Sequence, residues 1–185
     1  MIRVELLILS VFWVAFYIYW LVSAKNAKRN VRPNRAHAAY RILIIVIILP
    51  IFFAVRRFEP FVIAIPNPPL GMCGLILCAL GLSLAVWARK YLGKNWGMPM
   101  SVKEDPELVT TGPYRYVRHP IYSGILLAML GSALVSGVPW LVVFVCYGIY
   151  FAISARAEER LILREFPQEY PKYRAATKAI IPFVW

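Results

Sequence analysis

The sequence predicts an all-α membrane protein, a polytopic helix bundle in which residues 1–185 form a single domain. Of the 185 residues, 61% are hydrophobic and 16% are charged, whereas a soluble domain is nearer half apolar and a quarter charged. The apolar residues gather in runs close to the roughly 20 residues that a membrane-spanning helix needs. Basic residues gather between these runs. We therefore expect about five transmembrane helices, at about 4–24, 36–55, 70–88, 121–136 and 139–155.

The first three runs differ in character. Val4–Ala24 is too long and too rich in aromatic residues to be the apolar core of a signal peptide, the alternative interpretation. The second run is short as Ile42–Val55 and spans a membrane only if residues 36–40 extend it, and Pro50 predicts a kink. The third run, Leu70–Trp87, has small residues three and four positions apart, which permits close helix packing in lipid.

The last two runs are predicted to form a helical hairpin. Ser136–Pro139 has the composition of a tight turn. Such a turn returns both helices to one membrane face, so it should bring Arg118–His119 near Glu158–Glu159. The polar segment 89–118 before the hairpin is long for a loop, and loops of this length are often functional. We expect the last helix to continue past its apolar part and to end before Pro167.

The distribution of basic residues predicts the orientation in the membrane. Six Lys or Arg residues fall within 25–41, six within 89–118 and six after residue 155, against three elsewhere. Because basic segments are retained in the cytoplasm, the C-terminus and the polar clusters are expected in the cytosol and the N-terminus outside or in a lumen. The net charge of +12 fits anchoring beside anionic lipids. The lipid bilayer is therefore the expected partner, and nucleic acid is not.

Neither a disulfide framework nor a metal site is predicted. The three cysteines all lie inside apolar runs, and their spacing matches no paired motif. Only two histidines are present, too few to suggest a metal site built by the protein. No metal cofactor is therefore expected.

Two polar clusters at the ends of apolar runs are the candidates for chemistry. His119 precedes Pro120, and proline suits the first position of a helix, so His119 should lie at the helix start, where free amides can bind a polar or anionic group. Glu158 and Glu159 follow the fifth run, at a face where the other flanking charges are basic. Adjacent helical positions point about 100° apart, so one carboxylate can face the bundle while the other faces water. The alternative is that these residues are ordinary interfacial charges.

At these residues the sequence resembles a known family. The segment Gly112–Gly124, the pair Glu158–Glu159 and the segment Glu165–Tyr173 resemble the isoprenylcysteine carboxyl methyltransferases, which are related to the phospholipid methyltransferases. Leu92–Trp96 and Glu107–Val109 add to the likeness. The resemblance covers about 87–185, which would be the catalytic region.

The resemblance implies an integral-membrane methyltransferase that uses S-adenosylmethionine without a Rossmann domain, and the chain indeed lacks the glycine-rich dinucleotide fingerprint. It implies a cytosolic cofactor pocket formed by the loop before the fourth helix, the start of that helix and the C-terminal helix. Glu159 is the alternative to Glu158 as the partner of the cofactor. The expected cofactor-binding residues are Leu108, Val109, Tyr114, Arg118, His119, Pro120, Tyr122, Glu158 and Glu159.

One position departs from the family pattern. The resemblance implies an arginine four residues before the cofactor-binding glutamate, where it would hold a substrate carboxylate, but this chain has Ser154 there. Arg156 lies two residues further on, on a different helical face. It is the candidate for substrate orientation, because arginine can pair with a carboxylate in bidentate fashion.

The expected reaction is an in-line methyl transfer, which chiefly requires alignment of the reacting atoms. The expected acceptor is lipophilic or partitions into the membrane: a prenylcysteine-like carboxylate by resemblance, or alternatively a phospholipid amine or a thiol. Two hypotheses of other classes remain, an NADPH-dependent enzyme similar to sterol reductases and a non-enzymatic membrane scaffold or transporter.

Overall fold

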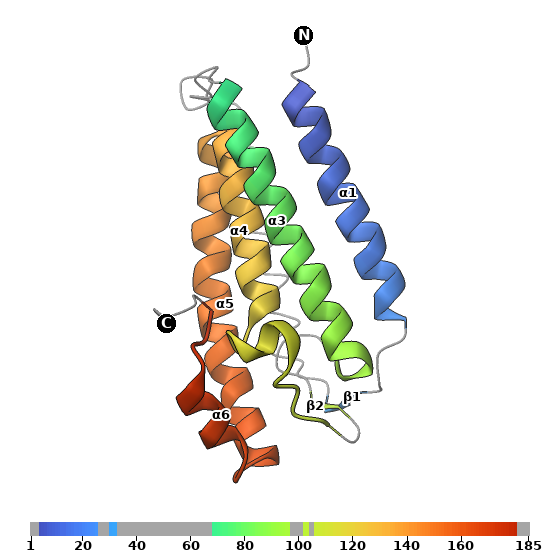
Figure 1. Cartoon of the computed structure of the whole chain (residues 1–185), viewed down its shortest axis with the longest axis vertical. Coiled ribbons are helices and arrows are strands. Elements are labelled where there is room, and N and C mark those ends of the chain that lie inside the picture. The colour runs from blue at the N-terminus through green and yellow to red at the C-terminus, as the bar shows by residue number, and fades with distance from the viewer. Residues whose placement is uncertain (1–3, 26–29, 33–67, 97–101, 104–105, 181–185) are drawn as a thin grey trace.

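A computed structural model describes residues 4–25, 30–32, 68–96, 102–103 and 106–180. Within these residues, four long helices run side by side: α1 (Val4–Ala24), α3 (Pro68–Leu92), α4 (Pro120–Ser136) and α5 (Val138–Glu165) (Figure 1). At the lower end of the view lie the short helix α6 (Tyr170–Ala176) and a small antiparallel pairing of β1 (Asn30–Arg32) with β2 (Val102–Lys103). A short 3-10 helix, η2 (Gly93–Asn95), follows α3, and another, η3 (Gly112–Arg115), precedes α4. The predicted all-α bundle is confirmed.

The long helices have the surface of a membrane protein. Three described helices are long and apolar enough to cross a bilayer, and α4, with 17 residues, is shorter. Large apolar side chains face outward: Val4 is 67% exposed and Leu21 is 69% exposed, an arrangement that suits lipid rather than water. The predicted second span, 36–55, lies outside the described residues, so the number of five spans stays a prediction.

The hairpin between the last two long helices forms at Gly137. This glycine ends α4 and begins α5 with a φ of 86°, a conformation that residues with a Cβ atom adopt at a cost. α5 continues past its apolar part to Glu165, and it ends before Pro167 as expected. α4 and α5 therefore run in opposite directions, with the start of one beside the end of the other (Figure 1).

Glycines allow α3 and α4 to pack backbone against backbone. A Cβ atom added to Gly81 would lie 2.5 Å from the carbonyl oxygen of Gly124 and 2.5 Å from the amide nitrogen of Ala128. One added to Gly131 would lie 2.5 Å from the carbonyl oxygen of Gly74. Close contact of this kind replaces the hydrophobic effect as a source of helix association in lipid.

Arg89 joins α1 to α3, although the sequence suggested a place in the polar loop. Its side chain is 4% exposed, donates to the carbonyl of Ser23 at 2.6 Å and to that of Gly93 at 2.7 Å, and lies 4.6 Å from the centre of the Trp96 ring. Further along α1, Trp13 donates from Nε1 to Ser132 Oγ at 3.0 Å. These bonds satisfy polar groups that would be costly to leave unpaired inside the bundle.

The close contact between α3 and α4 predicts that glycine-to-alanine substitutions at two positions will differ in their effect on stability. Gly81→Ala should lower the free energy of unfolding by about 1–3 kcal/mol, because the new methyl group overlaps the backbone of α4. Gly148→Ala is the matched control, since its Cβ would meet nothing nearer than 4.0 Å. Thermal unfolding in detergent micelles measures both; equal transition temperatures for the two variants would contradict the packing described.

Candidate functional site

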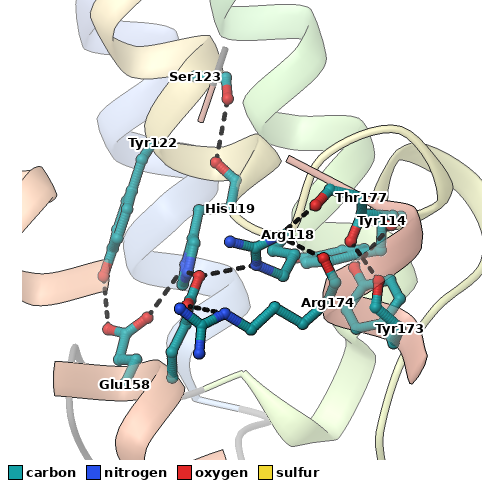
Figure 2. A network of polar contacts seen from close by, with 10 residues as sticks. Tyr114, Arg118, His119, Tyr122, Ser123, Glu158, Tyr173, Arg174 and Thr177 are labelled. Atoms are coloured by element: carbon teal, nitrogen blue, oxygen red, sulfur yellow. Dashed lines mark hydrogen bonds and ion pairs between the residues drawn. The ribbon is translucent and has the colours of Figure 1, made fainter. Parts of the chain in front are cut away.

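The site forms where the start of α4 meets the end of α5. η3 and the following residues lead the chain into α4, with His119 as the N-cap residue and Pro120 in the first turn. The Gly137 hairpin returns the chain, so that the carboxylates of Glu158 and Glu159 come to His119 (Figure 2). Residues some 40 positions apart in the sequence therefore share one cluster.

Both carboxylates face the bundle, so neither takes the water-facing position that adjacent helical positions would allow. Glu159 is 8% exposed and its Oε1 accepts from Arg118 Nε at 2.7 Å, while its Oε2 lies 3.5 Å from Arg174 Nε. The Glu158 side chain is 20% exposed and its Oε1 accepts from the Tyr122 hydroxyl at 2.5 Å. Glu159 is enclosed because the chain after α5 folds back and brings Arg174 to it, whereas Glu158 is directed to His119 and Tyr122.

His119 lies between the two carboxylates. Its Nδ1 is 3.4 Å from Glu158 Oε2 and its Nε2 is 3.4 Å from Glu159 Oε1, and its ring stacks on Tyr122 at a centroid distance of 5.3 Å. Burial by itself would lower the pKa of His119, but the two carboxylates outweigh burial and raise the pKa above its ordinary value. The separations are those of ion pairs rather than short hydrogen bonds, and they favour a positively charged imidazolium.

Tyrosines connect the cluster to its surroundings. Tyr122 also stacks on Phe151, with ring centres 4.3 Å apart. Tyr173 of α6 donates to the backbone carbonyl of Tyr114 at 2.6 Å. Burial raises the pKa of Tyr173 to about 12, so that its hydroxyl stays protonated and remains a donor at neutral pH.

A cavity of about 650 Å³ adjoins this cluster, a volume typical of small-molecule sites. One part of its wall is polar and includes His119 and Glu158; another part is aromatic and apolar and is formed by Trp13, Phe16 and Tyr147. The arrangement can hold a polar, partly cationic group beside an apolar one. Among the predicted residues, those that border the cavity are Leu108, Val109, Tyr114, Arg118, His119, Tyr122 and Glu158.

Three of the predicted site residues do not border the cavity. Pro120 and Glu159 are buried but do not border the cavity. Arg156 is exposed and also does not border it, because two helical positions turn its side chain about 200° away from Glu158. Ser154, on the inner face, is fully buried. Arg156 therefore lies outside the wall of the cavity that most of the other candidates share.

Sequence reasoning missed the part played by the end of the chain. Tyr170 is 1% exposed, and Arg174 and Thr177 contact the cluster through side-chain and backbone atoms. The tyrosines of the segment 165–173 were the available signal, since no motif marks the residues after them. Within the described parts of the chain, no group of His, Cys, Asp or Glu residues could hold a metal ion.

Comparisons with known proteins agree with the resemblance seen in the motifs. A family model described as phospholipid methyltransferase matches residues 70–169. The match begins in α3, earlier than the expected limit near residue 87. The chain is 28% identical to the protein-S-isoprenylcysteine O-methyltransferase of Saccharomyces cerevisiae, over 60% of this chain and 48% of that protein.

Other relatives and a solved structure extend the comparison. The nickel-cobalt-cadmium resistance protein NccN of Alcaligenes xylosoxydans xylosoxydans is 24% identical, over 77% of this chain and 62% of that protein. The eukaryotic intramembrane Ras methyltransferase ICMT has a similar structure, with a TM-score of 0.61 and 26% identity over 83% of this chain and 55% of that one. The chain thus spans about half to two thirds of the length of these proteins.

The position of His119 predicts a measurable pH dependence. Because the pKa of His119 is raised in the folded protein, its ion pairs should contribute fully to stability below the ordinary histidine pKa of about 6.5. That contribution should be lost as the pH rises through the folded-state pKa. NMR of the protein with ¹³C-labelled histidine measures the titration, and His37→Gln assigns the two resonances. Titration of His119 below the ordinary value would contradict the charged cluster.

Proposed function

The chain belongs to the phospholipid methyltransferase family, and from this premise we propose that it is a membrane methyltransferase that uses S-adenosylmethionine. The proposal rests chiefly on one observation: the histidine and the carboxylate of the motif border a single cavity that is polar on one side and apolar on another. A polar cofactor and a lipophilic acceptor could then meet in one chamber.

The residues present fit the cofactor in charge and polarity. The Glu158 carboxylate borders the cavity and could accept hydrogen bonds from a ribose diol, while its charge favours a cationic group nearby. Tyr114 also borders the cavity and could contact a planar ring, whereas the Tyr122 ring already stacks on His119 and Phe151. Leu108 and Val109 would supply apolar contacts from the loop before α4. When bound, S-adenosylmethionine supplies an activated methyl group.

The protein would contribute alignment and exclusion of water to the reaction. Methyl transfer needs the acceptor atom in line with the methyl group and its leaving sulfur, so the walls chiefly have to orient two molecules. The Tyr122 hydroxyl bonds Glu158 and would keep that carboxylate in one orientation. Apolar side chains in the wall would help to exclude water from the chamber once both molecules are bound, which would favour a step in which opposite charges neutralise each other.

The acceptor proposed is lipophilic or partitions into the membrane. The aromatic residues of α1 and α5 in the wall suit an apolar chain, and the names of several relatives point to a prenylcysteine-like carboxylate as the reacting end. A phospholipid amine or a thiol is the alternative, because Ser154 replaces the arginine expected to hold a carboxylate. Arg156 would be the residue that orients the substrate, because arginine can pair with a carboxylate.

For the topology we propose a single domain with its site at the cytosolic face. The last residues of α1, α3 and α5 lie at the same end of the bundle as the cluster (Figure 1), and the three basic segments adjoin that end in the sequence. The positive-inside rule would then orient this end toward the cytosol. The N-terminus would lie outside or in a lumen.

A binding experiment tests the cofactor and the role of Glu158. We expect the purified protein to bind S-adenosylhomocysteine in calorimetry, and Glu158→Gln to weaken binding by about ten- to a hundredfold, the loss expected for one hydrogen bond to a charged group. Arg164→Gln, an exposed change on the same helix, is the control and should bind normally. Preferential binding of NADPH, or binding of neither molecule, would reject the proposal.

A transfer experiment tests the acceptor. Protein supplied with methyl-labelled S-adenosylmethionine and a membrane lipid extract should transfer label to a lipophilic product, which mass spectrometry identifies by the gain of one methyl group. A farnesylcysteine analogue, a phosphatidylethanolamine and an alkyl thiol distinguish carboxylate, amine and thiol acceptors. Cofactor binding without transfer to any lipophilic molecule would contradict this part of the proposal.

A further inference from the structure

The end of the chain is bound to the start of α4 along its backbone. Residues 170–180, which we call the C-terminal strap, comprise α6 and the segment after it. Within the strap, Lys178 forms a parallel bridge with Val117. The amide of Arg118 donates to the carbonyl of Lys178 at 2.8 Å, and that of His119 donates to the carbonyl of Ala179 at 2.9 Å. The strap therefore satisfies the two amides that precede Pro120.

Arg118 connects the strap to α5 as well. Its Nε donates to Glu159 Oε1 at 2.7 Å, and its Nη1 donates to the backbone carbonyls of Thr177 and Arg174, the latter at 3.3 Å (Figure 2). The side chains of Arg118 and Glu159 are each 10% exposed. One guanidinium thus contacts α5, α6 and the segment after α6.

The two neighbouring carboxylates have different surroundings. Both oxygens of Glu159 have cationic neighbours, since Oε1 meets Arg118 and His119 and Oε2 meets Arg174. Glu159 does not border the cavity, whereas Glu158 does. A carboxylate enclosed by three cations has little capacity left for a ligand in the cavity.

We propose that Arg118 and Glu159 are positioning residues rather than cofactor ligands: they fasten the C-terminal strap to the start of α4 and thereby hold the His119 ring against Glu158. The expected effect of these two residues on cofactor binding rests on the proposed function, whereas their fastening of the strap does not. Arg118 borders the cavity, but three described contacts direct its guanidinium to Glu159 and the strap.

We call the Arg118–Glu159 pair and its contacts with the strap the clamp. His119 is the residue through which the clamp would affect the cavity. It is faced by Glu158 and Glu159 from α5 and by Tyr122 from its own helix. Arg118 contacts the same Glu159 oxygen as His119 does, and Arg174 from the strap contacts the other oxygen of that carboxylate. If Glu159 loses its charge, the ring keeps a carboxylate on one side only, and its orientation and its protonation should both change.

Hydrogen exchange tests the fastening without reference to any ligand. In Glu159→Gln and Arg118→Lys, which keep the size or the charge of the side chain, amides in 112–124 and in the strap should exchange at least about tenfold faster than in the natural protein, because the strap opens more often. Amides of α3 report whether the bundle stays folded. Arg164→Gln is the matched control and should change nothing. Unaltered exchange of the strap in both variants would overturn the clamp.

Cofactor binding and the histidine titration then separate a positioning role from direct contact. We expect each variant to weaken S-adenosylhomocysteine binding by about tenfold, and the double variant to lose no more than either single one, since both changes break one unit. Glu159→Gln should also move the NMR titration of His119 to lower pH, which a purely structural defect would not do.

Two results would count against the proposal. Lost affinity in Glu159→Gln with an unaltered strap and an unaltered His119 titration would make Glu159 a direct ligand. Losses that add in the double variant would mean that the two residues act separately. If the natural protein binds no S-adenosylhomocysteine, the proposed function fails, and hydrogen exchange still decides whether the clamp exists.

Discussion

The direct contact between the backbones of α3 and α4 is the constraint on which the rest of this structure depends. In a bilayer, burial of apolar side chains gives helices no strong reason to associate, so close packing has to supply the attraction. Gly81 and Gly124 leave room for only backbone atoms between the two helices, and Gly74 and Gly131 do the same two turns away. This contact fixes the position and direction of α4 relative to α3. The positions of the residues at the start of α4, including His119, are therefore fixed as well.

The site is assembled from three segments that are distant in the sequence. The turn at Gly137 returns α5 beside α4, and the C-terminal strap closes over the junction between them. Isolated charges in such a place would be costly, but here each described charge meets an opposite one: Arg118 meets Glu159, and His119 meets both carboxylates. Removing one member of a buried pair costs more than the pair contributes, so the cluster should behave as one unit.

Surroundings, rather than residue type, distinguish the two glutamates. Glu158 and Glu159 are chemically identical neighbours on one helix, yet one borders the cavity and the other is enclosed by cations. Under the proposed function, this assigns the first to the cofactor and the second to the support of His119. The aromatic part of the wall then serves the acceptor, so a small bundle can offer separate surroundings to a polar and a lipophilic molecule.

The sequence by itself determined the fold class and much of the site. The apolar runs, Gly137 and Pro120 were sufficient to predict a helix bundle, a hairpin and the meeting of His119 with the glutamate pair, because these features follow from local chain chemistry. Only the tertiary structure decided that Arg89 is buried, that both glutamates point inward, that Arg156 points outward and that the strap binds the start of α4. Those outcomes depend on which neighbour covers each face of a helix, and periodicity along one segment carries no information about a neighbour that lies dozens of residues away.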